Sequence, residues 1–135
     1  MVIIIDYETV MGKENLKDIY SLENCPVRNV LDRIGDKWSI LIIDLLGRYG
    51  TLRFNELNHR IGSISQKMLT VTLKTLEADG LVARKLYPQI PPKVEYSLTE
   101  MGKSMLPSVA MLTDWATTNM PAILASRAQY QNQGH

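Results

Sequence analysis

A change from helical to strand periodicity, just past the middle of the chain, is the feature that most constrains its fold. Residues 65–79 place apolar side chains three and four positions apart, which predicts a helix with one buried face. Ser65 is a good N-cap for this helix, and a glycine follows its last residue. Two strand-like segments, 81–87 and 94–98, come next and are joined by the proline-rich loop 88–93, which cannot be helical. The pattern therefore predicts an amphipathic helix followed directly by a β-hairpin.

Further predicted elements precede this helix. A first helix begins near Pro26, and a second begins after the N-cap Asp36 and runs to about residue 49. The second helix is apolar on nearly every side, which is typical of a central helix. Residues 51–53 favour a short strand, and residues 54–61 favour a short helix. The buried face of the first helix is predicted to consist of Val27, Val30, Leu31 and Ile34.

A last long helix is predicted from Glu100 to about Ala125. Pro107 should kink it or mark a restart, and Pro121 should do the same near its end. The whole order predicts an α+β fold, a winged helix-turn-helix domain with a three-helix core, a hairpin wing and flanking terminal helices. The predicted division of the chain is an N-terminal arm over 1–23, the domain over 24–126 and a frayed tail over 127–135.

Length and composition exclude several classes of protein. The 135 residues suit one domain, and an apolar share of 45% argues against wholesale disorder. The single cysteine allows no intramolecular disulfide, and a cysteine-based zinc site is not expected. With only two histidines, no phosphate-cradling glycine loop and no cluster of metal ligands, we expect neither an enzyme nor a bound cofactor or metal. The apolar run at residues 2–5 is too short to span a membrane, so we expect a cytoplasmic protein.

The charge is unevenly distributed along the chain. Residues 1–24 contain two basic and five acidic side chains, whereas residues 53–93 contain seven basic and three acidic ones. A near-neutral chain with one basic stretch indicates a local surface for a polyanion. A solvated surface with no such partner is the alternative interpretation.

The outward side of the helix over 65–79 carries side chains suited to the major groove of DNA. Glutamine pairs with adenine, lysine reaches guanine or phosphate, and threonine and valine contact the thymine methyl group. Serines at the helix start lie where backbone N–H groups favour a phosphate. An ordinary amphipathic surface helix would show a similar pattern. The predicted contacts of this helix are Ser63, Ser65, Gln66, Lys67, Thr70, Val71 and Lys74, whereas Met68, Leu69, Thr72, Leu73 and Leu76 are predicted to face the core.

Cations flank the predicted hairpin. Arg84, Lys85 and Lys93 lie on either side of its tip, and Arg53 precedes the short helix. In a winged helix the hairpin lies along the DNA backbone, where such cations neutralise phosphates. A charged hairpin can also merely protect a sheet edge. This hairpin directly follows a helix that could enter the major groove. The combination favours binding to double-stranded DNA over the alternative of a winged-helix protein-interaction module without DNA binding.

Several motifs resemble the HxlR-type family of bacterial winged-helix regulators. They occur in the family's order over about residues 25–116, and together they make the match specific. The resemblance implies a transcriptional regulator that binds an inverted-repeat operator as a homodimer through its terminal helices. The matching segments are Cys25-Pro26-Val27, Ile34-Gly35-Asp36-Lys37-Trp38, Arg53-Phe54-Asn55-Glu56-Leu57, Ile64-Ser65-Gln66-Lys67-Met68-Leu69, Leu76-Glu77-Ala78-Asp79-Gly80-Leu81-Val82 and Val94-Glu95-Tyr96-Ser97-Leu98-Thr99-Glu100-Met101-Gly102.

The last predicted helix carries an apolar stripe that one small core cannot easily cover. This pattern favours a partner helix in a dimer, although packing on its own domain remains an alternative. The stripe consists of Met101, Met105, Leu106, Val109, Leu112, Trp115 and Ala116.

Cys25 precedes the first predicted helix, where the helix dipole favours the reactive thiolate form. The family resemblance implies that a cysteine here senses oxidants or electrophiles in some members. We therefore expect an oxidant or small molecule as the effector. The alternative is that Cys25 is a small buried apolar residue at a helix cap.

Overall fold

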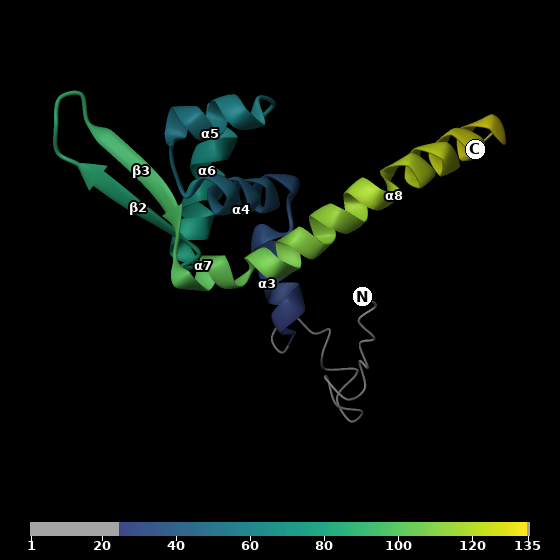
Figure 1. The fold of residues 1–135 in the computed structure, drawn as a ribbon, viewed down its shortest axis with the longest axis horizontal. Coiled ribbons are helices and arrows are strands. Elements are labelled where there is room, and N and C mark those ends of the chain that lie inside the picture. The colour runs from purple at the N-terminus through teal and green to yellow at the C-terminus, as the bar shows by residue number, and fades with distance from the viewer. Residues whose placement is uncertain (1–24, 135) are drawn as a thin grey trace.

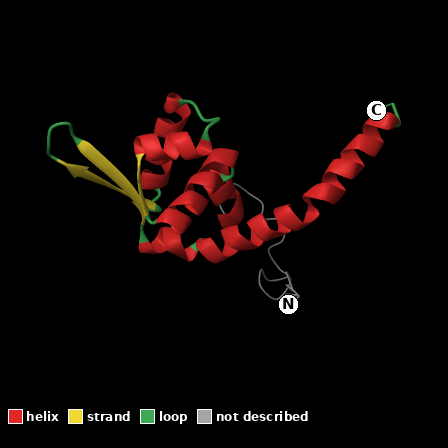
Figure 2. Cartoon of the chain, turned by 45° about the horizontal axis from the view of Figure 1, so that its top comes forward, coloured by secondary structure: helices red, strands yellow, loops and turns green. Residues whose placement is uncertain are grey.

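The computed structural model describes residues 25–134, so the predicted arm over 1–23 lies outside the described residues. Helices and a small sheet form a core, and the long C-terminal helix leads away from it (Figures 1 and 2). This is the predicted winged helix-turn-helix arrangement, with β2 and β3 as the wing. In chain order the elements are α3 (Pro26–Ile34), α4 (Lys37–Tyr49), β1 (Thr51–Arg53), α5 (Phe54–Ile61), α6 (Gln66–Ala78), β2 (Val82–Tyr87), β3 (Lys93–Leu98), α7 (Glu100–Ser104) and α8 (Leu106–Asn132).

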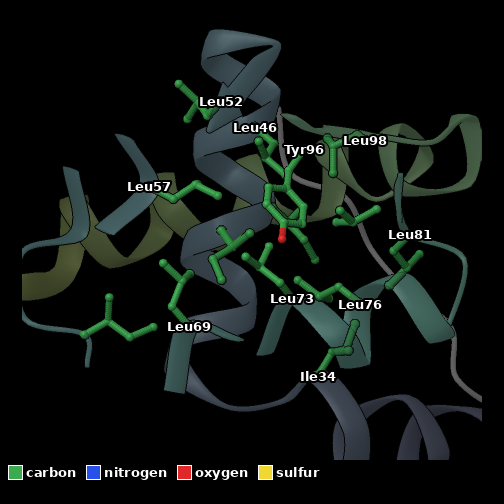
Figure 3. Close-up of a cluster of buried hydrophobic side chains, with 14 of the residues drawn as sticks. Ile34, Leu46, Leu52, Leu57, Leu69, Leu73, Leu76, Leu81, Tyr96 and Leu98 are labelled. Carbon is green, nitrogen blue, oxygen red and sulfur yellow. The ribbon is translucent and has the colours of Figure 1, made fainter. Parts of the chain in front are cut away.

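Helix α4 lies at the centre of the core, as its apolar sequence predicts. Ile42, Ile43 and Leu46 are fully buried and pack between α6, the sheet and the start of α8. Burying side chains of this size contributes about 1.5–3 kcal/mol each. Figure 3 shows leucines from α5 and α6 meeting Leu46 and the ring of Tyr96 in the same cluster.

The sheet has the strand order β1-β3-β2 and is antiparallel throughout. Tyr96 on the central strand pairs with Leu52 on one side and with Arg84 on the other. Because side chains alternate along a strand and cross-strand partners share a face, these residues define the inner face of the sheet, toward the core. The next row, Arg53, Glu95 and Lys85, belongs to the outer face.

The predicted N-caps of α4 and α6 are both present. The Asp36 carboxylate accepts hydrogen bonds from the backbone N–H groups of Trp38 and Ser39 at 2.9 Å and from the Ser39 hydroxyl at 2.7 Å. Burial acts to raise the pKa of Asp36, but these hydrogen bonds outweigh it and hold the pKa below its ordinary value. Ser65 accepts from the Met68 N–H at 3.0 Å and begins α6 in the same way.

The prediction of a buried face on α3 is largely wrong. Only Ile34 is buried, whereas Val27, Val30 and Leu31 are 51%, 49% and 58% exposed. The helical periodicity is real, but within residues 25–134 only the last turn of α3 reaches the core. Its remaining apolar face is available to another surface.

An ion pair joins α3 to the end of α6. The Nε of Arg33 donates to both carboxylate oxygens of Asp79 at 2.7 Å, and this contact raises the pKa of the Arg33 guanidinium above its ordinary value. Asp79 is the C-cap of α6. The orientation of α3 is thereby linked to the helix predicted to contact DNA.

The C-terminal helices differ from the prediction in length. The helical segment is interrupted at Met105, between α7 and α8. Pro107 lies in the first turn of α8, so the predicted restart of the helix is confirmed. Pro121 does not interrupt α8, which continues past the predicted end near Ala125 to Asn132. Residues 127–132 are therefore helical rather than frayed. Although α8 has 27 residues, no helix between residues 25 and 134 is long and apolar enough to cross a membrane.

Candidate nucleic-acid interface

Helix α6 presents one face to the core and the opposite face to solvent. Leu69, Leu73 and Leu76 are buried against α4 and the sheet, which holds the axis of α6 in place. The short turn before it contains Gly62 at φ +79°, a conformation that favours glycine, and the Asn58 side chain donates to the Ile64 carbonyl oxygen at 3.2 Å. The predicted contact residues of the turn and helix are all exposed: Ser63, Ser65, Gln66, Lys67, Thr70, Val71 and Lys74.

The exposed face of α6 is wider than predicted at its start. Met68, predicted to face the core, is 42% exposed and lies with Val71 in a shallow hollow beside Trp38. Thr72 is buried as predicted, and its hydroxyl donates to the Met68 carbonyl oxygen at 2.7 Å. Leu69 in the same turn is fully buried, so Met68 lies at the edge of the buried face, and the periodicity alone does not show how wide that face is.

The predicted wing cations do not form one patch, because strand alternation divides them between two faces. Lys85, Lys93 and Arg53 belong to the outer face of the sheet, whereas Arg84 belongs to the inner face, beside α6. The Nζ atoms of Lys85 and Lys93 each lie 4.9 Å from the centre of the Tyr87 ring.

Lys93 is further committed to a partner within the wing. Its Nζ lies 2.8 Å from a carboxylate oxygen of Glu95. The Lys93 ammonium lowers the pKa of Glu95 below its ordinary value, with smaller contributions from the Tyr87 hydroxyl and Arg53. Of the predicted wing cations, Arg84 is therefore the one that lies on the same side as α6.

The inner face of the wing and α6 enclose a groove that sequence reasoning missed. The predicted residues Thr70, Lys74 and Arg84 line it together with Tyr96. The sequence marks Tyr96 only as part of a strand motif, and the register with Arg84 was needed to place it here.

Cys25 lies at the N-cap of α3, as predicted. Its Sγ accepts the backbone N–H of Arg28 at 3.3 Å, and the side chain is 1% exposed. No group of three potential metal ligands is found between residues 25 and 134. The position matches the predicted helix N-terminus, and the burial means that a reagent reaches the sulfur only after a local opening.

The apolar stripe predicted for the dimer interface contains both buried and exposed residues. Val109 is buried in the core of its own domain, and Met105, Leu106 and Ala116 are half-buried. Met101, Leu112 and Trp115 are more than half exposed. Val30 of α3 lines a hollow together with Met101 and Met105 and extends this apolar surface, although the sequence had predicted Val30 to face the core.

Comparison with known proteins identifies the same architecture in transcriptional regulators. The model of the HxlR-like helix-turn-helix family matches residues 33–123. The HTH-type transcriptional regulator YtfH of Escherichia coli strain K12 is 47% identical over 105 residues, covering 78% of this chain and 82% of YtfH.

Two solved structures of redox or transcriptional regulators are also similar. The redox regulator HypR in its oxidised form has a TM-score of 0.66 at 47% identity and covers 70% of this chain and 97% of HypR. The reduced form of the transcriptional regulator YodB from Bacillus subtilis has a TM-score of 0.60 at 39% identity, covering 68% and 90% of the two chains.

Proposed function

The chain belongs to the HxlR-like helix-turn-helix family of transcriptional regulators, and from this premise we propose that it binds an inverted-repeat operator in duplex DNA as a homodimer. It is a regulator of the helix-turn-helix type and not an enzyme. The observation that carries the proposal is the exposed polar face of α6, held in place by leucines on its opposite face.

The side chains on this face have separate proposed roles. Gln66 reads adenine, Lys67 and Lys74 contact guanine edges or phosphates, and Thr70 and Val71 contact thymine methyl groups. The Thr70 hydroxyl donates to the Gln66 carbonyl oxygen at 2.8 Å, so its proton is bonded within the helix. Ser63 and Ser65 lie at the start of α6, where backbone N–H groups favour a phosphate.

Reversing the charge of Lys67 tests this proposal. We expect Lys67→Glu to weaken operator binding at least about tenfold at physiological salt and to reduce the salt slope by about 2, because one phosphate contact is lost in each of the two half-sites. The measurement is fluorescence anisotropy with a duplex selected from random sequence, repeated at several salt concentrations. The control is Lys103→Glu on α7, another exposed lysine, which lies outside the proposed interface.

Two outcomes would contradict the proposal. Equal binding by Lys67→Glu and the parent would show that α6 is not the contact surface. DNA binding that is absent or independent of salt would favour a winged-helix protein-interaction module instead, because phosphate contacts require salt dependence. A changed base preference in Gln66→Ala would support direct readout.

The proposed dimer accounts for the exposed apolar surfaces of α3 and α8. A two-fold axis through these helices would place two copies of α6 in successive major grooves, about 34 Å apart. The ion pair between Arg33 and Asp79 connects α3, on the proposed interface, with the end of α6. Subunit contacts would in this way set the spacing of the half-sites.

We also propose that oxidation of Cys25 changes operator affinity. The support is its place at a helix N-terminus and the similarity to HypR and YodB, which are solved in reduced and in oxidised or diamide-treated forms. Because Cys25 is the only cysteine, its Sγ would form a disulfide with the partner subunit's Cys25 or with a small thiol. Any such bond would remove the buried sulfur from its contact with the Arg28 N–H.

Treatment of the protein with diamide and a small thiol tests the proposed role of Cys25. Diamide takes two electrons and both thiol protons while the disulfide forms, and we expect operator affinity to change about fivefold or more. The control is Cys25→Ser, which keeps an N-cap side chain and should not respond. Unchanged affinity of the wild type, with its modification verified by mass spectrometry, would contradict the proposal, and so would a thiol that diamide leaves unmodified.

A further inference from the structure

A groove of about 550 Å³ lies between α6 and the inner face of the sheet. It runs beside the face of α6 proposed to enter DNA, and its other wall is formed by β2 and β3. The polar side chains along it come from both walls. Those from α6 are Thr70, Lys74 and Glu77, and those from the sheet are Arg84 and Tyr96.

Tyr96 reaches this groove from within the core. Its side chain is 8% exposed, and Figure 3 shows its ring beside Leu46 with the hydroxyl oxygen directed toward Leu73 on α6. Among residues 25–134 the hydroxyl has no hydrogen-bond partner, yet it is not sealed in the core, because no buried side-chain oxygen there is left unsatisfied. A tyrosine buried to this degree normally bonds its hydroxyl, so the open groove is where its partner belongs.

The charges around this hydroxyl favour an anion. Arg84 is the direct cross-strand neighbour of Tyr96 on the inner face, and Lys74 lies on the opposite wall. Within the described residues neither cation forms an ion pair, whereas Lys93 on the outer face is neutralised by Glu95. Glu77 is the one carboxylate in the groove, and it repels an anion from its own end.

We propose that this groove seats one phosphodiester of the DNA backbone, with the Tyr96 hydroxyl donating to a phosphate oxygen between Arg84 and Lys74. This inference rests on the proposed function. When α6 enters the major groove and the wing lies on the far side of the backbone, the ridge of sugar and phosphate passes between them. The groove occupies that gap, and Tyr96, held by the core, positions the phosphate more rigidly than a long surface lysine does.

The test compares Tyr96→Phe with a matched control. Tyr96→Phe keeps the ring in the core, and we expect affinity to fall about five- to tenfold with an unchanged salt slope, because a neutral donor is lost. Arg84→Gln should reduce both the affinity and the slope, the latter by about 2, because the proposed dimer has one such groove in each subunit. The control is Tyr87→Phe, which removes a hydroxyl from the outer face of the same hairpin and should leave the affinity unchanged within about twofold.

Two further measurements address the phosphate itself. A neutral methylphosphonate introduced at single backbone positions should weaken binding of the wild type at one position in each half-site, and Arg84→Gln should lose most of that sensitivity. Glu77→Gln should tighten binding, because the repelling carboxylate is removed. Thermal unfolding of each variant shows whether it remains folded.

The outcomes separate this inference from the proposed function. If Tyr96→Phe binds as the wild type does while Lys67→Glu loses affinity, the proposal of a phosphate in the groove is wrong, and the proposal of DNA binding through α6 stands. If the wild type does not bind DNA, both are wrong. If Tyr96→Phe and Tyr87→Phe weaken binding equally, the effect does not come from the groove, and the proposal of a phosphate in the groove is again wrong.

Discussion

Replacing Gly102 by alanine will destabilise the fold by about 3 kcal/mol, and thermal denaturation will show a midpoint lower by roughly 10 °C. Gly102 is buried in α7, where the chain turns from the wing into the C-terminal helices. An added Cβ would overlap the carbonyl oxygen of Leu81 and would lie 3.2 Å from the Leu98 side chain. The Leu81 oxygen also accepts the Thr99 N–H at 3.0 Å, so it cannot withdraw without breaking that contact.

The matched control is alanine at Gly47, within α4. A Cβ there would lie 2.5 Å from the end of the Leu106 side chain, which can rotate away, and alanine has the higher helix propensity by about 1 kcal/mol. We expect Gly47→Ala to stay within about 1 kcal/mol of the wild type. Equal stability of both variants would show that the backbone of Leu81 moves away at little cost. The predicted destabilisation by Gly102→Ala would then be wrong.

Placing aspartates at Leu112 and Trp115 together will convert the proposed dimer into a monomer. The two side chains are 53% and 58% exposed and lie on neighbouring sides of α8. In a dimer they would be covered, and burying two carboxylates in an apolar contact is strongly unfavourable. A buried interface tryptophan alone often contributes 2 kcal/mol or more, so we expect the dimer dissociation constant to rise at least about a hundredfold.

Sedimentation equilibrium measures this change, and operator binding reports its consequence. With the two copies of α6 no longer linked, affinity for the full operator should fall by about two orders of magnitude toward that of a half-site. The control is Ala110→Asp, because residue 110 is exposed on the opposite side of α8. A wild type that is monomeric at micromolar concentration, or a double variant that remains dimeric, would contradict the proposed interface.

The errors of prediction share one origin. The period of α3 correctly marked Val27, Val30 and Leu31 as one face, but a period does not show whether a face meets its own core or another subunit. Met68 was assigned to the core by the same rule, although it lies at the edge of the buried face of α6 and is 42% exposed. In both cases the helix was predicted correctly, but the sequence did not show which other elements would cover it.

The wing shows a second kind of limit. The sequence marks Arg84, Lys85 and Lys93 as cations of one hairpin, and they do belong to it. Their division between the inner and outer faces depends on the register of β2 against β3 and on the side of the sheet that meets α6. The groove with Tyr96 depends on the same placement, so no local pattern predicts it.

By itself, the sequence determined the order and nearly all the bounds of the elements, because caps, prolines, glycines and apolar spacing act within a few residues. It also determined that one side of α6 would be polar, since side-chain order along a helix sets its faces. The tertiary structure alone decided which apolar faces stay uncovered, which wing cation stands beside α6, and that the Tyr96 hydroxyl opens into the groove between them. These depend on contacts between segments far apart in the chain, whose geometry follows from the packing of the whole core.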